Sequence, residues 1–432
     1  MSMKQLFKQA WAQLRQQPII SAVSVAGTAL AIFLIMLVVM MQQVKTAPFA
    51  PESNRDRFLH VKMGSITHKA WGADNSSNGA WSVHALQDIY KPMKTPEAVT
   101  IYTYMTMSTP VSLPGEPSFA VDILETDADF WRVFDFAFQQ GKPYDEAAFT
   151  AGQPVAVLTE SVARRLFSTT DVVGKEFLLA YVPYRVAGVV KDVSTLANTA
   201  YAQVWVPYTS TNQVHNTWEG DLMGGMSCTI LAKDAADFPA IREEAIRRLE
   251  AKNKSLEETG YAYINRNRPY TQEKDVLAFG ANYEPDVEAD RRQRWTIYLI
   301  LLIVPAINLS SMTQSRLRQR VSEIGVRRAF GATRAELMGQ LLGENLIVTL
   351  LAGLFGLLLS ILFAYVGSEF LFAQEFSYTL APPTVDASIL IQPSTFLMAL
   401  AFCFVLNLLS TGIPAWRASR MKIVDSIGGK LH

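Results

Sequence analysis

The sequence predicts a membrane protein of two parts, an α-helical membrane domain of four transmembrane helices and a large mixed α/β domain outside the membrane. The 432-residue chain is 50% hydrophobic but only 18% charged, whereas soluble domains carry about 25% charged residues. Four long apolar runs explain this deficit of charge. Between the first and second runs lies a segment of about 250 residues with strand and helix patterns. These observations together define the fold class.

The first apolar run, residues 18–41, has 24 residues and no charge, and about 20 apolar residues suffice to cross a bilayer. The alternative is a cleaved signal peptide, but the apolar part of such a peptide has only about 7–15 residues. A retained anchor is therefore favoured. The second run is shorter and contains Pro305 and Asn308. The predicted spans are residues 18–41, 294–312, 341–366 and 393–413, and the second span is expected to continue as a helix to residue 320.

Lys and Arg residues gather on one side of the predicted spans. The segments before the first span, between the second and third spans and after the fourth hold 13 basic and 3 acidic residues, whereas residues 43–293 hold 25 basic and 32 acidic ones. The short loop 367–392 has acidic but no basic residues. Because cytoplasmic loops are enriched in Lys and Arg, both termini are predicted to be cytoplasmic and residues 42–293 external. The neutral total also argues against nucleic-acid binding, which usually needs a basic excess.

Residues 1–17 show a helical pattern of their own. Leu6, Phe7, Ala10, Trp11 and Leu14 fall on one face of a helix, with basic residues beside them. This pattern is typical of an amphipathic helix that lies on the cytoplasmic leaflet. An ordinary cytoplasmic extension of the first span is the alternative, and both interpretations stay open.

The external segment alternates between strand and helix signals. Runs rich in Val, Thr, Ile and Tyr predict strands, and apolar residues at helical spacing predict helices; Thr159 is the expected N-cap of one of these helices. The arrangement indicates a discontinuous α/β subdomain that carries an insertion. The predicted strands are residues 57–63, 98–107, 154–158, 184–190 and 226–233. The predicted helices are residues 83–93, 160–167 and 237–252.

Motifs that would support catalysis are missing from the 432 residues. The sequence has no GxxxxGK[ST] phosphate loop, no HExxH helix and no GxSxG turn, which are the local patterns of nucleotide binding, zinc hydrolysis and serine hydrolysis. The five histidines are scattered, and of the two cysteines Cys228 is external while Cys403 lies in the fourth span. We therefore expect no catalytic residue, no bound cofactor, no metal and no intrachain disulfide.

The loop between the second and third spans carries the most specific signal. Gly325 and Gly331 permit turns on either side of a short predicted helix, residues 326–330. Thr333 and Glu336 have the spacing of a capping box for the following helix. A short amphipathic helix bounded by turns suits docking into a groove of a soluble partner. The alternative is a plain basic loop that only sets the topology.

Several stretches resemble a known family. SEIGVRRAFGATRAELMGQLLGE is similar to the signature of FtsX-like permeases, which include the MacB type of ABC exporter. IPAWRASRMKIVDSI resembles the C-terminal end of the same family. Outside the membrane, ETDADFWRVFDFAFQQGKPY, PVAVLTESVARRLF, DVVGKEF and YRVAGVVKDV resemble, in order, the MacB-like periplasmic core domain. The resemblance runs from the first span to the C-terminal tail.

The resemblance implies a four-span permease of a bacterial inner membrane, paired with a second permease copy or paralogue and with two ABC ATPase subunits that bind ATP and Mg²⁺. Because the chain lacks the N-terminal ATPase domain of the MacB exporter, the ATPase is expected on a separate chain. A periplasmic adaptor and an outer-membrane channel are further expected partners. The coupling helix that docks on the ATPase would comprise Glu323, Ile324, Gly325, Val326, Arg327, Arg328, Ala329, Phe330, Gly331 and Ala332.

The family's mechanism is mechanotransmission, in which ATP hydrolysis moves the periplasmic domain and thereby drives export or membrane extraction of a peptide, drug or lipid-linked molecule. The alternative is a signalling protein that activates a hydrolase or senses a peptide; a receptor without an ATPase is a third possibility. Small residues such as Ala22, Ala26, Ala29, Gly353 and Gly356 suit either a dimer seam or packing within the chain. The implied segments are a porter-like part at 43–107 and 220–292, a sabre-like insertion at 108–219, a coupling loop at 321–340 and a tail at 414–432.

Overall fold

The computed structural model describes residues 15, 18–72, 75–372, 379–380, 387–390 and 392–420, and the chain separates into two compact units. The helical unit comprises residues up to Gln43, Glu288–Leu371 and the residues from Asp386 onward. The α/β unit comprises Val44–Val287 and Phe372–Val385. The predicted surface helix at 1–17, apart from Arg15, and the tail beyond residue 420 lie outside the described residues.

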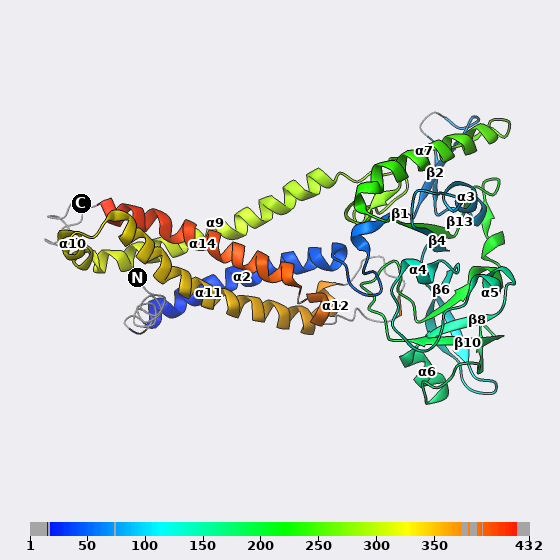
Figure 1. Cartoon of the computed structure of the whole chain (residues 1–432), viewed down its shortest axis with the longest axis horizontal. Helices are drawn as coiled ribbons and strands as arrows, with labels where there is room; N and C mark the ends of the chain where they lie inside the picture. Colours follow the sequence, from blue (N-terminus) through cyan, green and yellow to red (C-terminus); the bar gives the residue numbers. More distant parts are fainter. Residues whose placement is uncertain are drawn as a thin grey trace. The chain divides into compact units, whose positions relative to one another are not determined.

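Among the described residues, four long helices build the helical unit (Figure 1). Each is long and apolar enough to cross a membrane, which confirms the four predicted spans by length and composition. The second of these helices passes Pro305 without a break and extends well beyond its span, as predicted. The four helices are α2 Pro18–Thr46, α9 Val287–Gln319, α11 Arg334–Val366 and α14 Pro393–Arg420, and the short helices α12 Ser368–Leu371 and α13 Ala387–Leu390 lie between the last two.

Close contact between the long helices depends on glycine. A Cβ atom at Gly356 would collide with the Ala29 carbonyl oxygen on α2, and a Cβ atom at Gly353 would collide with a cysteine sulfur on α14. Backbones approach this closely only where the side chain is missing. Gly353, Gly356 and Ala29 therefore serve packing within the chain, whereas Ala22 and Ala26 are exposed.

A large mixed sheet dominates the α/β unit and confirms the predicted fold class. The strand order is β11-β8-β10-β9-β5-β6-β4-β14-β1-β16, with β7 paired to β10. Strand β8 runs parallel to β10, and β11 runs parallel to β6. These strands are β1 Phe58–Val61, β4 Ala98–Thr103, β5 Met107–Ser112, β6 Phe119–Thr126, β7 Phe138–Gly141, β8 Val155–Thr159, β9 Glu176–Leu179, β10 Val182–Val190, β11 Val204–Pro207, β14 Met226–Leu231 and β16 Tyr270–Thr271.

The pairing of β11 with β6 closes six strands into a ring, in the order β6-β11-β8-β10-β9-β5. Side chains from these strands fill its interior, among them Val111, Ile123, Leu158 and Val186. A second core lies where β1, β4 and β14 face the helices of the unit. A third, aromatic cluster contains Phe58, Tyr102, Phe130, Phe134 and Trp205 and draws on both parts of the sheet. The division of the unit at residues 108 and 219 stays a prediction.

Two small sheets and several helices complete the α/β unit. The predicted helix at 83–93 is shorter, because Pro92 disfavours a helical conformation at Lys91; Thr159 occupies the predicted N-cap position. The small sheets are β15-β2-β3 and β12-β13, built from β2 Gly64–His68, β3 Ser77–Gly79, β12 Thr217–Trp218, β13 Met223–Gly224 and β15 Tyr261–Tyr263. The helices are α3 Val83–Ile89, α4 Phe130–Val133, α5 Glu146–Thr150, α6 Glu160–Phe167, α7 Phe238–Ser255 and α8 Gln272–Asp275, with short 3-10 turns η1 Arg55–Arg57, η2 Tyr208–Ser210, η3 Gln213–His215 and η4 Ala235–Asp237.

Candidate functional site

The loop between α9 and α11 contains a helix, α10 Val321–Ala329 (Figure 1). The sequence placed this helix at 326–330 with a turn at Gly325, and that placement is wrong. Gly325 is buried inside the helix, which begins after Arg320. The predicted turn at Gly331 is confirmed, with φ at +96°. One glycine costs a helix only about 1 kcal/mol, so burial of the neighbouring Ile324 offsets it.

The inner face of α10 is anchored in an apolar cluster. Val321 and Ile324 are buried, at the three-residue spacing that places side chains on one helical face. Ile324 packs between the end of α9, the start of α11 and the end of α14. The other members of the cluster are Leu317, Leu337, Leu341, Ala415 and Ala418. The helix is therefore fixed to three long helices of its unit.

The start of α11 confirms the predicted capping box. The Glu336 backbone N–H donates to the Thr333 hydroxyl at 3.2 Å, and the Thr333 backbone N–H donates to the Glu336 carboxylate at 2.9 Å. These bonds satisfy two donors that a helix start otherwise leaves without partners. They also hold the pKa of Glu336 below its ordinary value. The capping box thus fixes the residue at which the turn after α10 ends and α11 begins.

Five polar side chains form a closed ring of hydrogen bonds around the inner side of α10. Arg320 donates to Glu344 at 2.8 Å and to Glu323 at 3.1 Å. Arg327 donates to Glu323 at 2.6 Å and to Gln340 at 2.7 Å. Gln340 completes the ring by donating to Glu344 at 2.7 Å. We call these residues the loop ring; they join α10 to α11 in addition to the apolar cluster.

Charge pairing within the loop ring outweighs partial burial. Burial alone would lower the pKa of Arg320, but the carboxylates of Glu344 and Glu323 hold it above its ordinary value. Burial alone would raise the pKa of Glu323, but Arg320 and Arg327 hold it below its ordinary value. Both shifts favour the charged forms of Arg320 and Glu323.

The outer face of α10 is apolar and exposed. Ser322, Val326, Ala329 and Phe330 are all exposed, and their spacing of i, i+4, i+7 and i+8 places them on one side of the helix. The Phe330 side chain is 89% exposed and that of Val326 is 45% exposed. We call Val326, Ala329 and Phe330 the apolar ridge. An exposed aromatic ring of this kind is typical of a surface that binds another protein.

The structure therefore separates the ten predicted docking residues into two groups. Ile324 is buried and Arg327 is bonded within the loop ring, so neither belongs to the apolar ridge. The docking role of the ten residues stays a prediction. The sequence reasoning also missed Gln340 and Glu344 as parts of the site. The four-residue spacing within each of the pairs Glu323–Arg327 and Gln340–Glu344 was a usable signal.

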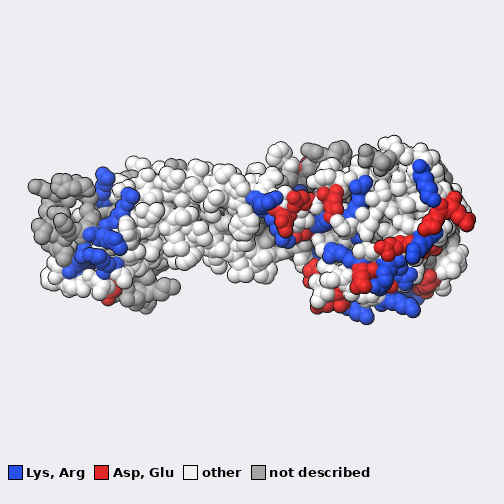
Figure 2. All heavy atoms as spheres, turned by 90° about the horizontal axis from the view of Figure 1, so that it is seen from above, with Lys and Arg blue, Asp and Glu red and all other residues white. Residues whose placement is uncertain are grey.

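Basic side chains surround this end of the helical unit. Figure 2 shows Lys and Arg gathered near the loop, an uncharged surface along the long helices, and both signs of charge mixed on the α/β unit. The half-buried or exposed arginines of the described residues near the loop are Arg318, Arg320, Arg327, Arg328, Arg334, Arg417 and Arg420. Such a distribution matches the basic side of a membrane protein.

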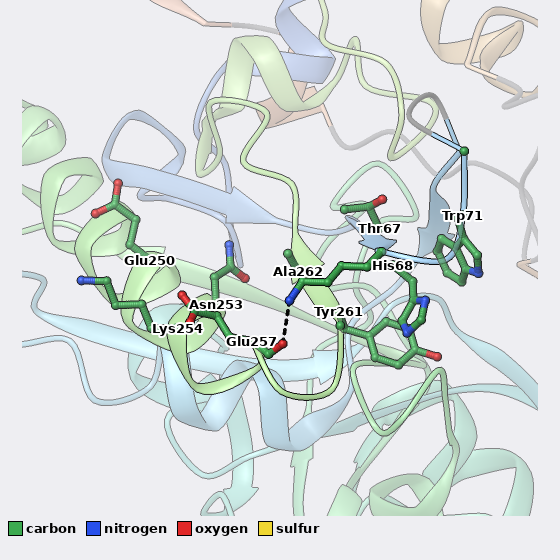
Figure 3. A pocket seen from close by; sticks show the side chains of 12 residues that line it. Thr67, His68, Trp71, Glu250, Asn253, Lys254, Glu257, Tyr261 and Ala262 are labelled. Carbon is green, nitrogen blue, oxygen red and sulfur yellow. Dashed lines mark hydrogen bonds between the residues drawn. The ribbon is translucent and has the colours of Figure 1, made fainter.

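The α/β unit holds a second candidate, an open groove of about 560 Å³ beside the small sheet (Figure 3). His68, Trp71 and Tyr261 form one aromatic wall, with ring centroids 4.4 to 6.0 Å apart. The charged rim combines two lysines with two glutamates, so charge does not select between cationic and anionic ligands. The charged lining residues are Lys69, Lys254, Glu250 and Glu257.

Side chains of this groove also close a strand edge. The Asn253 amide donates to the Tyr263 carbonyl at 2.9 Å and accepts from the Tyr263 N–H at 2.8 Å. The amide takes the place of a neighbouring strand and blocks strand addition at this point.

In the parts of the chain that the structure describes, no group of three or more His, Cys, Asp or Glu residues could hold a metal ion.

Comparison with known families identifies the chain. A model of the MacB-like periplasmic core domain matches residues 21–248, and a model of the FtsX-like permease C-terminal region matches residues 295–423. The chain belongs to the FtsX/MacB-type ABC permease family. The second match includes most of α9 and all of α10 and α11, so the candidate site of this permease lies in the part that the family shares.

Curated relatives of this permease include the macrolide export ATP-binding/permease protein MacB of Escherichia coli strain K12 and the protein of the same name from Shigella flexneri. Each is 24% identical over 311 residues, which is 69% of this chain but 42% of the relative. The permease chain thus spans less than half the length of these relatives. The described helices and the periplasmic core domain fit a protein of the inner membrane.

Solved structures are similar to part of this chain. The extracellular domain of the noncanonic ABC-type transporter YknZ from Gram-positive bacteria is 15% identical, with 47% of this chain and 100% of that chain covered and a TM-score of 0.33. The periplasmic region of MacB from Actinobacillus actinomycetemcomitans is 19% identical, with 47% and 88% covered and a TM-score of 0.33.

Proposed function

We propose that this permease is the membrane subunit of an ABC transporter and that α10 docks its apolar ridge into a groove on an ABC ATPase. The observation that carries the proposal is the two-faced character of α10. Its inner face is fixed by the apolar cluster and the loop ring, while Val326 and Phe330 point outward and are exposed. A partner protein can bind the exposed apolar face of such a rigidly held helix. Movement of the partner then displaces the helix and the elements to which it is fixed.

Helix α9 can transmit such a displacement away from α10. The loop ring and the apolar cluster tie α10 to both α9 and α11, so the three move together when the ATPase moves the apolar ridge. Helix α9 then continues without a break from Gln319 to Val287, where the α/β unit ends. Mechanotransmission is the mechanism that this continuity supports. The chain itself would perform no catalysis, and ATP and Mg²⁺ would be bound by the ATPase.

The family and the charge distribution support the rest of the assembly. We propose two ABC ATPase subunits and a second permease copy or paralogue, with both termini and α10 in the cytoplasm and the α/β unit in the periplasm. A periplasmic adaptor and an outer-membrane channel are further proposed partners. The proposed work is export, or extraction from the membrane, of a peptide, drug or lipid-linked molecule. Macrolide export is the activity named for the longer relatives.

The docking proposal is tested by co-purification of the full-length chain with its cognate ATPase. Phe330→Asp and Val326→Asp should each abolish recovery of the ATPase while the permease still inserts into the membrane. Tyr181→Asp is the matched control, because Tyr181 is also an exposed aromatic residue, 75% exposed, on the α/β unit. Undiminished ATPase recovery with both α10 variants would reject the docking site.

Substitution of the arginines tests docking less cleanly. Replacing Arg327 together with Arg328 would also break the loop ring, so a loss of ATPase binding could come from a displaced α10.

The orientation of the chain in the membrane is tested separately by cysteine labelling. A cysteine placed at the exposed Asp145 should react with an impermeant reagent from outside, and one at the exposed Arg318 should not. The reverse labelling would contradict the proposed topology.

A further inference from the structure

A buried ion pair lies just after the end of α2, within the α/β unit. The Arg55 Nε donates to the Glu52 carboxylate at 2.7 Å, and both side chains are 1% exposed. The Phe49 ring lies 4.2 Å from the guanidinium carbon and covers it. Stability alone gives little reason for such a pair, because well-packed apolar residues often serve as well. The other hydrogen-bond partners of Arg55 and Glu52 therefore indicate the role of this ion pair.

The guanidinium of Arg55 binds two distant parts of the chain at once. One terminal nitrogen donates to the carbonyl oxygens of Val44 at 2.8 Å and Ala47 at 3.1 Å, at the end of α2. The other donates to the Leu196 carbonyl oxygen at 2.9 Å. The planar fork of arginine makes these bonds in fixed directions. The last turn of α2 is thus connected through Arg55 to Leu196, which lies 141 residues after Arg55 in the chain.

Glu52 adds two bonds to the same distant segment. One carboxylate oxygen accepts the backbone N–H groups of Thr199 at 2.8 Å and Ala200 at 2.9 Å, while the other faces Arg55. Hydrogen bonds to an ionised group are about twice as strong as neutral ones. The segment from Leu196 to Ala200 is therefore held by both members of the pair, through one carbonyl and two amides.

A neighbouring side chain holds the same helix end from another direction. Gln272 donates to the Lys45 carbonyl oxygen at 2.9 Å, and its own oxygen lies 2.8 Å from a ring nitrogen of the buried His60 on β1. The last carbonyls of a helix have no partner inside the helix. Here the carbonyls of residues 44, 45 and 47 all accept bonds from side chains of the α/β unit.

We propose that Arg55 and Glu52 are positioning residues that form a joint between the last turn of α2 and the insertion predicted at 108–219, through which motion of this helix end reaches that insertion. This proposal rests on the mechanotransmission proposed above. Strand β1, which follows the joint in sequence, pairs with β14 and β16. The joint therefore bypasses those strands and acts on residues 196–200, directly before β11 of the closed six-stranded ring.

Arg55→Lys is the most informative variant. Lysine keeps the positive charge beside Glu52, but its single ammonium cannot reach the carbonyls of α2 and of Leu196 in the same arrangement. Arg248→Lys is the matched control. Arg248 likewise pairs with a glutamate, Glu244, at 3.1 Å and donates to the Pro92 carbonyl at 2.7 Å, but none of these contacts involves α2.

The experiment uses the full chain with its cognate ATPase in lipid nanodiscs. Spin labels are placed at the exposed positions Glu176, in the insertion, and Glu258, outside it, and their distance is measured with and without ATP. The native Cys228 and Cys403 are buried and do not interfere. The wild type and Arg248→Lys should show a change of distance with ATP, and Arg55→Lys should lose this change while its ATP-free distance stays that of the wild type.

The outcomes distinguish the two proposals. An unchanged response to ATP in Arg55→Lys would overturn the joint alone. A wild type that binds ATPase but shows no change of distance would overturn mechanotransmission, and the joint with it. Should Arg55→Lys not fold, Glu52→Gln provides a second reading, because the amide oxygen still accepts from Thr199 and Ala200 but the ion pair is lost. A full response to ATP in that variant would likewise contradict the joint.

Discussion

Arg320 donates a 2.8 Å hydrogen bond to Glu344, and this contact links the turn after α9 to the interior of α11. The Glu344 side chain is 2% exposed, whereas that of Arg320 is 26% exposed. The two residues are therefore not equivalent. Arg320 has a second carboxylate partner in Glu323, while among the described residues the other hydrogen bond to the Glu344 carboxylate comes from the neutral Gln340 amide.

The first prediction follows from this asymmetry. Arg320→Met should destabilise the helical unit by about 3–5 kcal/mol, because it leaves the buried Glu344 without a cation. Glu344→Gln should cost less, since Arg320 keeps Glu323 as a partner. Thermal unfolding of the full chain in detergent measures both variants. Equal losses of stability would contradict this account of the loop ring.

A second prediction concerns the start of α11. Thr333→Ala should lower stability by about 1 kcal/mol, because it removes the hydroxyl that accepts the Glu336 N–H. Amide hydrogen exchange at residues 334–336 should become faster. Thr333→Ser keeps a hydroxyl and is the control. If the alanine and serine variants exchange at the same rate, the capping box does not stabilise this helix end.

The third prediction uses the buried carboxyl of Glu125 on β6. Burial raises its pKa to about 7, although Thr211 donates a 2.6 Å hydrogen bond to it. Because the folded state binds this proton more tightly than the unfolded state, the contribution of Glu125 to stability is complete below about pH 4.5 and is lost as the pH rises through 7. Glu125→Gln mimics the protonated form.

The glutamine variant should therefore be more stable than the wild type at pH 8, by up to about 3 kcal/mol, and similar to it at pH 4.5. The melting temperature of the α/β unit within the full chain, followed at both pH values, measures the difference. A stability difference that does not depend on pH would show that Glu125 ionises normally in the folded protein.

The fourth prediction concerns the contact of α11 with α2. Gly356→Val should destabilise the helical unit by about 1–3 kcal/mol, because its side chain would overlap the Ala29 carbonyl and force the helices apart. Gly339→Ala is the matched control on the same helix, where a Cβ meets no atom within 4 Å. The control should be neutral or slightly stabilising, since alanine favours a helix. A tolerated valine would mean that α2 and α11 can separate without cost.

Much of this architecture was predictable because its causes are local. Apolar length specified the four long helices, and the Thr333–Glu336 spacing specified the start of α11. Short runs rich in β-branched and apolar residues indicated strands such as β8 and β10. The boundaries of α10 were missed, because Gly325 was interpreted as a turn. Burial of Ile324 against α9, α11 and α14 keeps that glycine helical, and this contact involves residues distant in sequence.

The sequence by itself determined the fold class, the four spans, the family and the position of the loop that contains α10, since hydropathy, charge and motif spacing act over a few residues. Only the tertiary structure decided which face of α10 is exposed, which ring of side chains holds it, and where Arg55 and Glu52 bind. The pairing of β11 with β6 was likewise decided only by the tertiary structure. Each of these contacts joins residues distant in the chain, and their partners are chosen by burial and by hydrogen-bond direction after the chain has folded.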